Sequence, residues 1–512
     1  MLELGDAGNE ARRAASGGTM TFLKTFFARV FSRARRLAAR LTTRDATEDR
    51  AFDEVDFASP RALASALSRE VAFARAARTH LLRLASRGAF ALAIGFASGL
   101  LGAAFLFALR EAQTFFLWSE VSSSRGSAPR ALFALPFVGL AIVWAYRRCG
   151  LSVDAGTNQV VESLHTSRRA SLFLAPLIFF STAATHAFGG SSGREGAALQ
   201  LGGCVGLGRG RLFRVKRETL RAAIYSGMAG GFASVFGAPL AATIFALEIG
   251  CVGTVYYPAF LPSLIAATAG ASITFRLGFS HFTYSLPHFE PTSFFAAFQA
   301  LALGLLCGAA CVFFCTTLRF ASRSLTRRFP NDYLRAFFGG LCVAVGAVAL
   351  GSVAYNGAGF DLIQRALSGE ARPWDFALKT LFTAATLGAG FKGGEIVPCL
   401  AVGSTFGCWI APFLGLEPSF GAALGMISTF CGATNCPLAS LALSVELFGA
   451  YAALFFALAC GASYATSGHA GLYQSQRILY SKSTDRPFDR RLQSRLRQDL
   501  DALVEQDDAE GV

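Results

Sequence analysis

The chain has 512 residues, of which 53% are hydrophobic and only 16% are charged, and its mean hydropathy is +0.44. Because soluble domains carry about a quarter charged residues, this composition excludes an ordinary soluble domain and indicates a membrane protein. The net charge of +14 is assigned to segments that flank the membrane, and no nucleic-acid-binding module is visible.

The first 88 residues are polar and rich in Ala and Arg. Helical periodicity is present in Phe22–Leu41 and again in Arg61–Leu84. The first of these resembles a basic amphipathic helix that lies at a membrane surface, and an Arg-rich signal or transit peptide is the alternative. Ser59 and Pro60 predict the start of the second helix. We expect residues 1–88 to form a cytoplasmic N-terminal region.

Apolar segments of uneven length follow. Ala89–Trp118 and Ala131–Tyr146 can each span, or nearly span, a hydrocarbon core of about 30 Å. Gly196–Gly208, Val397–Leu414 and Pro437–Leu447 are short or bounded by Gly and Pro. Such pieces must be half-helices or tilted helices buried in protein. We therefore predict an all-α integral membrane protein, a helical bundle with broken helices.

The apolar region repeats the same landmarks in its two halves: an acidic residue in a glycine-rich break, then a Pro, then a second acidic residue. The interval from Pro to the second acid is 9 residues in both halves, and that from the first acid to Pro is 44 or 42 residues. This pattern is typical of transporters built from inverted repeats. We predict repeats at 89–290 and 291–480, followed by a cytoplasmic polar tail at 481–512. The landmarks are Gly193-Arg194-Glu195-Gly196, Pro239 and Glu248, and then Gly393-Gly394-Glu395, Pro437 and Glu446.

Glu195 lies where glycines let the backbone turn and an apolar helix begins. The unpaired N–H groups of a helix start bind anions. A carboxylate can occupy the place of the anion, and protonation would release it, so Glu195 is a candidate gate that couples anion movement to protons. The structural alternative is that Glu195 only caps its helix and pairs with Arg194. Because Glu395 recurs in the second half, we expect the two helix starts to face each other across a pseudo-two-fold axis.

The remaining charges within the apolar region receive structural interpretations. Glu248 and Glu446 are interpreted as carboxylates at helix ends. Asp375 and Lys379 are interpreted as charges close to loops.

No metal site or cofactor is predicted, because the histidines lack ligand spacing and the 12 cysteines include no CxxC pair. A rival hypothesis of another class is an intramembrane enzyme that uses His186 or His469 with Ser467. It leaves the matched glutamates unexplained, so the chain is not predicted to be an enzyme.

The placement of Arg and Lys predicts the orientation in the membrane. Arg147 and Arg148 follow the second apolar segment, and a basic segment follows Tyr473. Both termini are therefore expected in the cytoplasm, and the membrane is expected to be a plasma (inner) membrane.

Over residues 89–476 the chain resembles the CLC family of chloride channels and anion/proton exchangers. The resemblance implies a homodimer of inverted-repeat helical subunits with one pore each. By this resemblance, Glu195 corresponds to the external gating glutamate. The resemblance also implies that the N–H groups of Ile396 and Val397 coordinate the central anion and that the Tyr473 hydroxyl closes this anion site. Gly193, Arg194 and Gly196 complete the implied anion site. The matching motifs are Gly193–Gly196, Gly237–Ala241 and Gly432–Ala439.

The chain also departs from the common family pattern. In place of the Gly-Ser-Gly-Ile-Pro loop it has Gly156–Val160, so Thr157 or Asn158 must substitute for the coordinating serine. Ile249 stands where chloride/proton exchangers carry an internal glutamate. An acid after two glycines, as at Glu395, resembles the sequence of the fluoride-exporting branch of the family. That branch typically has Thr at the position of Val397.

The leading functional hypothesis is exchange of a halide, fluoride or chloride, for protons across a membrane. Glu195 would be the gate and proton carrier, and Glu395 a central acid on the proton path. The alternative is a passive, voltage-gated-type chloride channel. The expected partners are small anions, protons, the lipid bilayer and a second copy of the chain.

Overall fold

The computed structural model describes residues 60–121, 129–153, 156–164, 171, 173–213, 215–279, 284, 294–478 and 482. The expected helix Phe22–Leu41 and, apart from residue 482, the expected tail at 481–512 lie outside the described residues. The chain divides into two units, Met1–Ala89 and Phe90–Val512. Helix α4 (Pro60–Val121) begins at Pro60 and is continuous, so Arg61–Leu84 is its first part and not a separate helix.

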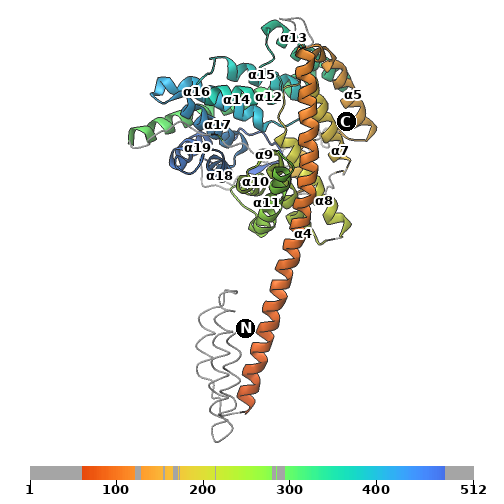
Figure 1. Cartoon of the computed structure of the whole chain (residues 1–512), viewed down its shortest axis with the longest axis vertical. Coiled ribbons are helices and arrows are strands. Elements are labelled where there is room, and N and C mark those ends of the chain that lie inside the picture. The colour runs from red at the N-terminus through yellow and green to blue at the C-terminus, as the bar shows by residue number, and fades with distance from the viewer. Residues whose placement is uncertain are drawn as a thin grey trace, which may run out of the picture. The chain divides into compact units, whose positions relative to one another are not determined.

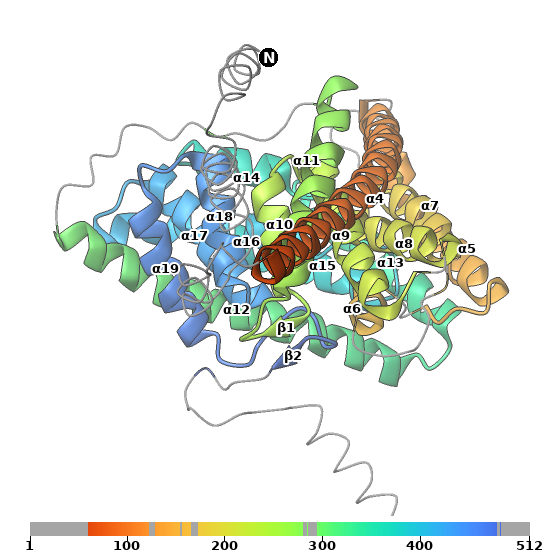
Figure 2. The same ribbon diagram turned by 90° about the horizontal axis from the view of Figure 1, so that it is seen from below.

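The predicted all-helical fold is confirmed, and helices make up nearly all of both halves (Figure 1). Helices α8 to α11 lie side by side in Figures 1 and 2, and so do α16 to α19. The first half contains η1 (Arg130–Ala134), α5 (Leu135–Arg148), α6 (Thr157–Ser163), α7 (Leu174–Ala187), α8 (Glu195–Leu212), α9 (Arg217–Phe236), α10 (Pro239–Glu248), η2 (Tyr257–Ala259) and α11 (Phe260–Arg276). The second half contains α12 (Phe294–Arg328), α13 (Asp332–Leu350), α14 (Phe360–Leu367), α15 (Asp375–Gly388), α16 (Ile396–Ile410), η3 (Ala411–Leu414), α17 (Pro418–Thr434), α18 (Pro437–Phe448) and α19 (Ala453–Thr466).

Within the described residues, six segments are long and apolar enough to cross a membrane. Four further apolar helices, α7, α10, α18 and α19, are shorter, as the uneven apolar segments of the sequence predict. A parallel pair of short strands joins the segment between α10 and η2 to the segment after α19. The strands are β1 (Cys251–Val252) and β2 (Arg477–Ile478). The six long segments are Arg75–Leu117, Arg130–Arg148, Tyr257–Arg276, Phe295–Arg328, Asp332–Leu350 and Ile396–Leu414.

The Pro-Leu-Ala motifs form the same helix–turn–helix junction in both halves. Gly237 ends α9 in the left-handed conformation (φ 81°), and Pro239 then begins α10. In the second half Asn435 has φ 59° after α17, and Pro437 begins α18. A left-handed residue ends a helix, and a Pro in the first turn starts one because its missing N–H is not needed there.

Each half supplies a carboxylate to the helix start of the other half. Glu446, near the end of α18, accepts hydrogen bonds from the Leu240 and Ala241 N–H groups of α10 at 2.9 and 2.8 Å. Glu248, at the end of α10, accepts from the Leu438 and Ala439 N–H groups of α18 at 3.3 and 2.8 Å. Helices α10 and α18 therefore lie against each other (Figure 2). These reciprocal helix caps, in which each half supplies the acceptor for a helix start of the other, hold the two repeats together.

Replacement of Glu446 with Ala is expected to destabilise the protein by about 1–3 kcal/mol, because two N–H groups at the start of α10 lose their acceptor. Thermal unfolding of the purified protein in detergent measures this as a lower Tm. The control is Glu218→Ala, which removes an exposed carboxylate from the first turn of α9. Equal Tm values for Glu446→Ala and the wild type would show that the exchanged cap contributes nothing.

Small residues let the paired helices of each half approach closely. A Cβ atom on Gly202 of α8 would lie 2.0 Å from the Gly227 carbonyl oxygen of α9. In the second half a Cβ on Gly403 of α16 would lie 2.4 Å from the Gly425 carbonyl oxygen of α17. Close backbone approach at small residues is how helices associate in membranes. These pairs position the starts of α8 and α16, where the candidate site lies.

Candidate functional site at the junction of the two repeats

The structure brings the two glycine-rich breaks into direct contact. Gly193 and Gly394 form an antiparallel bridge in which each N–H donates to the carbonyl oxygen of the other at 2.6 Å. The contact requires glycine, since a Cβ on Gly394 would lie 2.6 Å from the Gly196 nitrogen. Residues 201 positions apart in the chain thus place the starts of α8 and α16 at one point.

Glu195 is the first residue of α8 and is fully buried at this junction. One carboxylate oxygen accepts from the backbone N–H of Arg194 at 3.0 Å, and the other accepts from the Arg194 Nε at 3.1 Å. Gly193 also lies close to the carboxylate, because a Cβ built on it would be 3.2 Å from Glu195 Oε2. The carboxylate is therefore held at the helix start by contacts that depend on its negative charge.

Arg194 faces a cavity of about 500 Å³, termed here the Arg194 cavity. Its guanidinium lies over the ring of Phe360, 4.7 Å from the ring centroid. Other polar residues that line this cavity are Arg110, Gln113, His186, Asn356 and Asp361. Glu195 itself is not among the residues that line this cavity, whereas its ion-pair partner Arg194 is.

The second helix start opens on a different cavity, of about 550 Å³, termed the Glu395 cavity. Glu395 is the N-cap residue of α16 and lines this cavity with Tyr473. Ile396 and Val397 are buried in the first turn of α16, and the first N–H groups of a helix have no partner within it. The predicted N–H donors and the predicted tyrosine are thus at the same end of α16.

Thr157 and Asn158, the candidates to replace the missing serine, also line the Glu395 cavity. The Thr157 hydroxyl accepts from Gln200 Nε2 at 2.7 Å, so its own proton remains available to an anion. Asn158 Oδ1 instead accepts from the Ser475 N–H at 3.1 Å and holds the segment that follows Tyr473. Of the two, Thr157 is the better placed donor. Gln200 was missed in the sequence, where its signal is a lone amide within the apolar run of α8.

Lys379 lies in α15 and is fully buried, which the sequence did not indicate. Its interpretation as a charge close to loops is confirmed, because its partners lie between α7 and α8 and between α13 and α14. Its ammonium donates to the Ser191 hydroxyl at 3.0 Å and to the carbonyl oxygens of Tyr355 and Gly357 at 3.1 and 2.8 Å. Ser191 lies four positions before Glu195. Lys379 therefore holds the first glycine-rich break against the loop that lines the Arg194 cavity.

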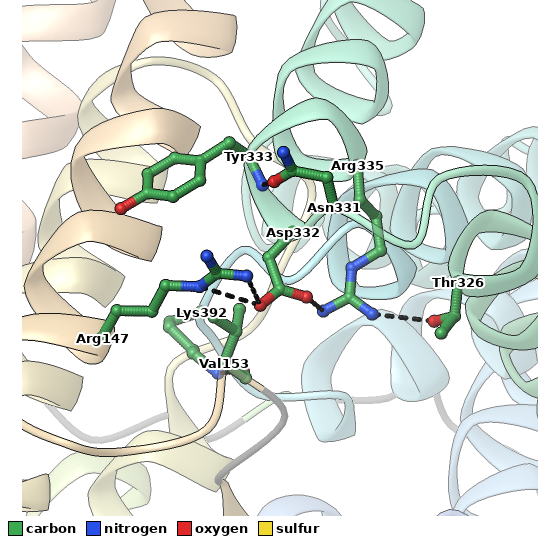
Figure 3. A network of polar contacts seen from close by, with 8 residues as sticks. All are labelled: Arg147, Val153, Thr326, Asn331, Asp332, Tyr333, Arg335 and Lys392. Carbon is green, nitrogen blue, oxygen red and sulfur yellow. Dashed lines mark hydrogen bonds and ion pairs between the residues drawn. The ribbon is translucent and has the colours of Figure 1, made fainter.

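A second lysine holds the other break. The Lys392 ammonium donates to the Val153 carbonyl oxygen (Figure 3). It also lies 4.4 Å from the centroid of the Tyr146 ring. Beside it, Asp332 accepts from Arg147 at 2.8 Å and pairs with Arg335 at 3.2 Å. This network joins the end of α5 to the start of α13 at the wall of the Glu395 cavity (Figure 3).

The residues of the enzyme hypothesis lie in different environments. His186 is on α7, where Nδ1 contacts the Thr182 carbonyl oxygen at 2.9 Å, and it lines the Arg194 cavity. Ser467 follows α19, donates to the Tyr464 carbonyl oxygen and accepts from Lys482 at 3.0 Å. The geometry gives this serine a structural role.

Comparison with known proteins places this arrangement in a family. A family model described as voltage gated chloride channel matches residues 138–468. The chain is 36% identical over 406 residues, 78% of this chain and 87% of the relative, to a chloride/fluoride channel protein of Pseudomonas syringae pv. tomato. It is 28% identical over 380 residues, 70% of this chain and 81% of the relative, to an H+/Cl− exchange transporter of Vibrio vulnificus.

Solved structures have the same fold. The crystal structure of a CLC-type fluoride/proton antiporter aligns with a TM-score of 0.73 and 31% identity, and covers 78% of this chain and 99% of that one. A slow cyanobacterial Cl−/H+ antiporter aligns with a TM-score of 0.64 and 21% identity over 74% of this chain and 94% of that one. The chain is therefore an integral membrane protein that belongs to the voltage-gated chloride channel, or CLC, family.

Proposed function

We propose that the protein exchanges a small halide, fluoride or chloride, for protons across the membrane. The observation that carries the proposal is the buried Glu195 carboxylate at the junction of two helix starts, with the Arg194 cavity and the Glu395 cavity adjoining that junction. An anion that passes from one cavity to the other must replace this carboxylate. Relatives described as a fluoride/proton antiporter and as an H+/Cl− exchange transporter support the same activity.

The exchange follows from competition for one set of donors. A proton that binds Glu195 cancels the charge that holds the carboxylate against Arg194 at 3.0 and 3.1 Å, and both contacts weaken. The neutral side chain can then leave, and a halide can occupy the helix starts, where unpaired N–H groups favour an anion. Return of the carboxylate expels the halide and releases the proton. One proton therefore moves for each displacement.

Glu395 is the candidate inner proton acceptor. Ile249 cannot accept a proton at the position of the family's internal glutamate, whereas Glu395 lines the cavity next to the glycine bridge. An acid at this position can receive a proton from Glu195 and deliver it to the water of the Glu395 cavity. The presence of a second acid, Glu395, near Glu195 favours exchange, because passive chloride conduction needs no proton acceptor.

The wider setting follows from the same proposal. The Glu395 cavity is lined by Tyr473, which precedes the basic C-terminal segment, so by the positive-inside rule it opens to the cytoplasm. Both termini are then cytoplasmic, and the membrane is the plasma (inner) membrane of a cell. The protein acts as a transporter and not as an enzyme, and it is a homodimer with a separate path in each subunit.

The decisive experiment is a flux assay with purified protein in liposomes that contain a pH probe. A fluoride or chloride gradient should drive protons against their own gradient, in the direction opposite to the halide flux. Halide flux without proton movement would establish the passive channel. Exclusion of both halides would overturn the proposal.

Replacement of Glu395 with Gln is expected to lower halide-driven proton flux by about a hundredfold, the scale lost when a positioned proton-transfer group is removed. Halide binding should persist, because the N–H groups of α16 are unchanged. The same liposome assay, with isothermal calorimetry of fluoride binding, measures both effects. Glu370→Gln, which alters an exposed carboxylate after α14, serves as the control and should match the wild type. Undiminished proton flux in Glu395→Gln would remove Glu395 from the proton path.

A further inference from the structure

Three arginines on α12 face the Glu395 cavity. Arg319, Arg323 and Arg327 follow one another at intervals of four residues, and all three line this cavity. Four residues are about one helical turn, so the three side chains lie on one face with about 6 Å of rise between them. Arg327 and Arg323 are exposed and Arg319 is half-buried. Together they form a row, termed the arginine row, that runs from the cavity mouth inward.

The inner end of this row adjoins the proposed transport site. Arg319 Nε donates to the Cys315 carbonyl oxygen at 3.2 Å, and Cys315 lines the cavity together with Glu395 and Tyr473. An anion that moves along the row therefore ends beside the start of α16.

In the described part of the chain, no carboxylate forms an ion pair with any member of the row. Asp332, the first residue of α13, is already shared by Arg147 and Arg335 (Figure 3). Arg335 also donates to Thr326, which lines the cavity from the same helix as the row. The positive charge of the row is thus left to attract mobile anions.

We propose that the arginine row is a second anion-binding site, distinct from the site at the glycine bridge, which takes up the halide before the exchange step. A cavity lined by charges of one sign raises the local concentration of the opposite ion. Guanidinium groups also bind oxyanions through bidentate hydrogen bonds. Two arginines one turn apart suit a small anion with two charged groups, so inorganic pyrophosphate should bind the row and compete with the halide.

Binding is tested without transport, by calorimetry of pyrophosphate with the full-length protein in detergent. Wild type should bind, and the double variant Arg323→Gln/Arg327→Gln should bind roughly tenfold more weakly or worse. The matched control is Arg328→Gln, an exposed arginine on the same helix that does not line the cavity, and its affinity should change less than about twofold. Equal losses in both variants, or no binding to wild type, would overturn the proposal.

The effect of the arginine row on transport kinetics rests on the proposed transport function, and it is measured in liposomes. Loss of the row should raise the KM for fluoride about threefold or more and leave the maximal rate within about twofold, because capture is weakened and the exchange step is not. Pyrophosphate on both sides of the membrane should inhibit wild type and not the double variant. A lower maximal rate with unchanged KM would assign the arginines to the exchange step and overturn a capture site. If calorimetry shows binding while no halide is transported by wild type, the proposed function fails and the anion site stands.

Discussion

Replacement of Glu195 with Gln is expected to abolish halide-driven proton movement, with a loss of about a hundredfold. Gln keeps the size of the side chain and can still accept hydrogen bonds from Arg194, so the fold should remain intact. It cannot bind and release a proton in the range of physiological pH, so the exchange cycle loses its carrier. Halide should then move down its gradient without a proton in return.

The assay is the liposome system with a pH probe, complemented by the elution volume and Tm of the purified variant as measures of folding. Glu218→Gln, which changes an exposed carboxylate on α9, provides the reference and should transport as the wild type does. Retained uphill proton movement in Glu195→Gln would show that another group is the gate.

The second large effect is expected for Gly394→Ala. The added Cβ would lie 2.6 Å from the Gly196 nitrogen, so the two breaks must separate. The separation disrupts both 2.6 Å hydrogen bonds of the Gly193–Gly394 bridge, at a cost of about 1–3 kcal/mol. If this cost raises the barrier to transport by the same amount, the transport rate falls by about fivefold to 150-fold.

The chain contains a matched control for this substitution. Gly461 lies within α19, and a Cβ built on it would meet no atom within 4 Å. Gly461→Ala should therefore transport normally and have an unchanged or higher Tm, since Ala favours the helix by up to about 1 kcal/mol. Comparable loss of flux in both variants would mean that the bridge contributes nothing specific to the transport path.

Much of the fold could be predicted from the sequence because membrane proteins are strongly constrained. Lipid cannot satisfy backbone N–H and C=O groups, so apolar segments must be helices and short ones must be buried in protein. The matched Pro239 and Pro437 landmarks begin α10 and α18, and the family resemblance is confirmed by the family model. Local rules of helix start and end were sufficient there.

Contacts between distant segments could not be predicted in the same way. Lys379 contacts Ser191 across 188 positions, and no local pattern shows that this lysine is buried or which three oxygen atoms accept from it. The exchange of caps between Glu248 and Glu446 also depends on how α10 and α18 pack. The charge of each side chain is visible in the sequence, but the group that neutralises it is not.

The sequence by itself determined that this is a helical membrane protein with an inverted repeat and an acid at each glycine-rich break. Composition and short-range backbone preferences are local properties, and they are sufficient for those conclusions. Only the tertiary structure decided that Gly193 and Gly394 touch, that Glu195 is enclosed while Glu395 faces a cavity, and that the arginine row shares that cavity. These facts depend on packing between the two halves. It brings together residues that are far apart in the sequence, and the local periodicity of hydrophobic residues carries no information about such contacts.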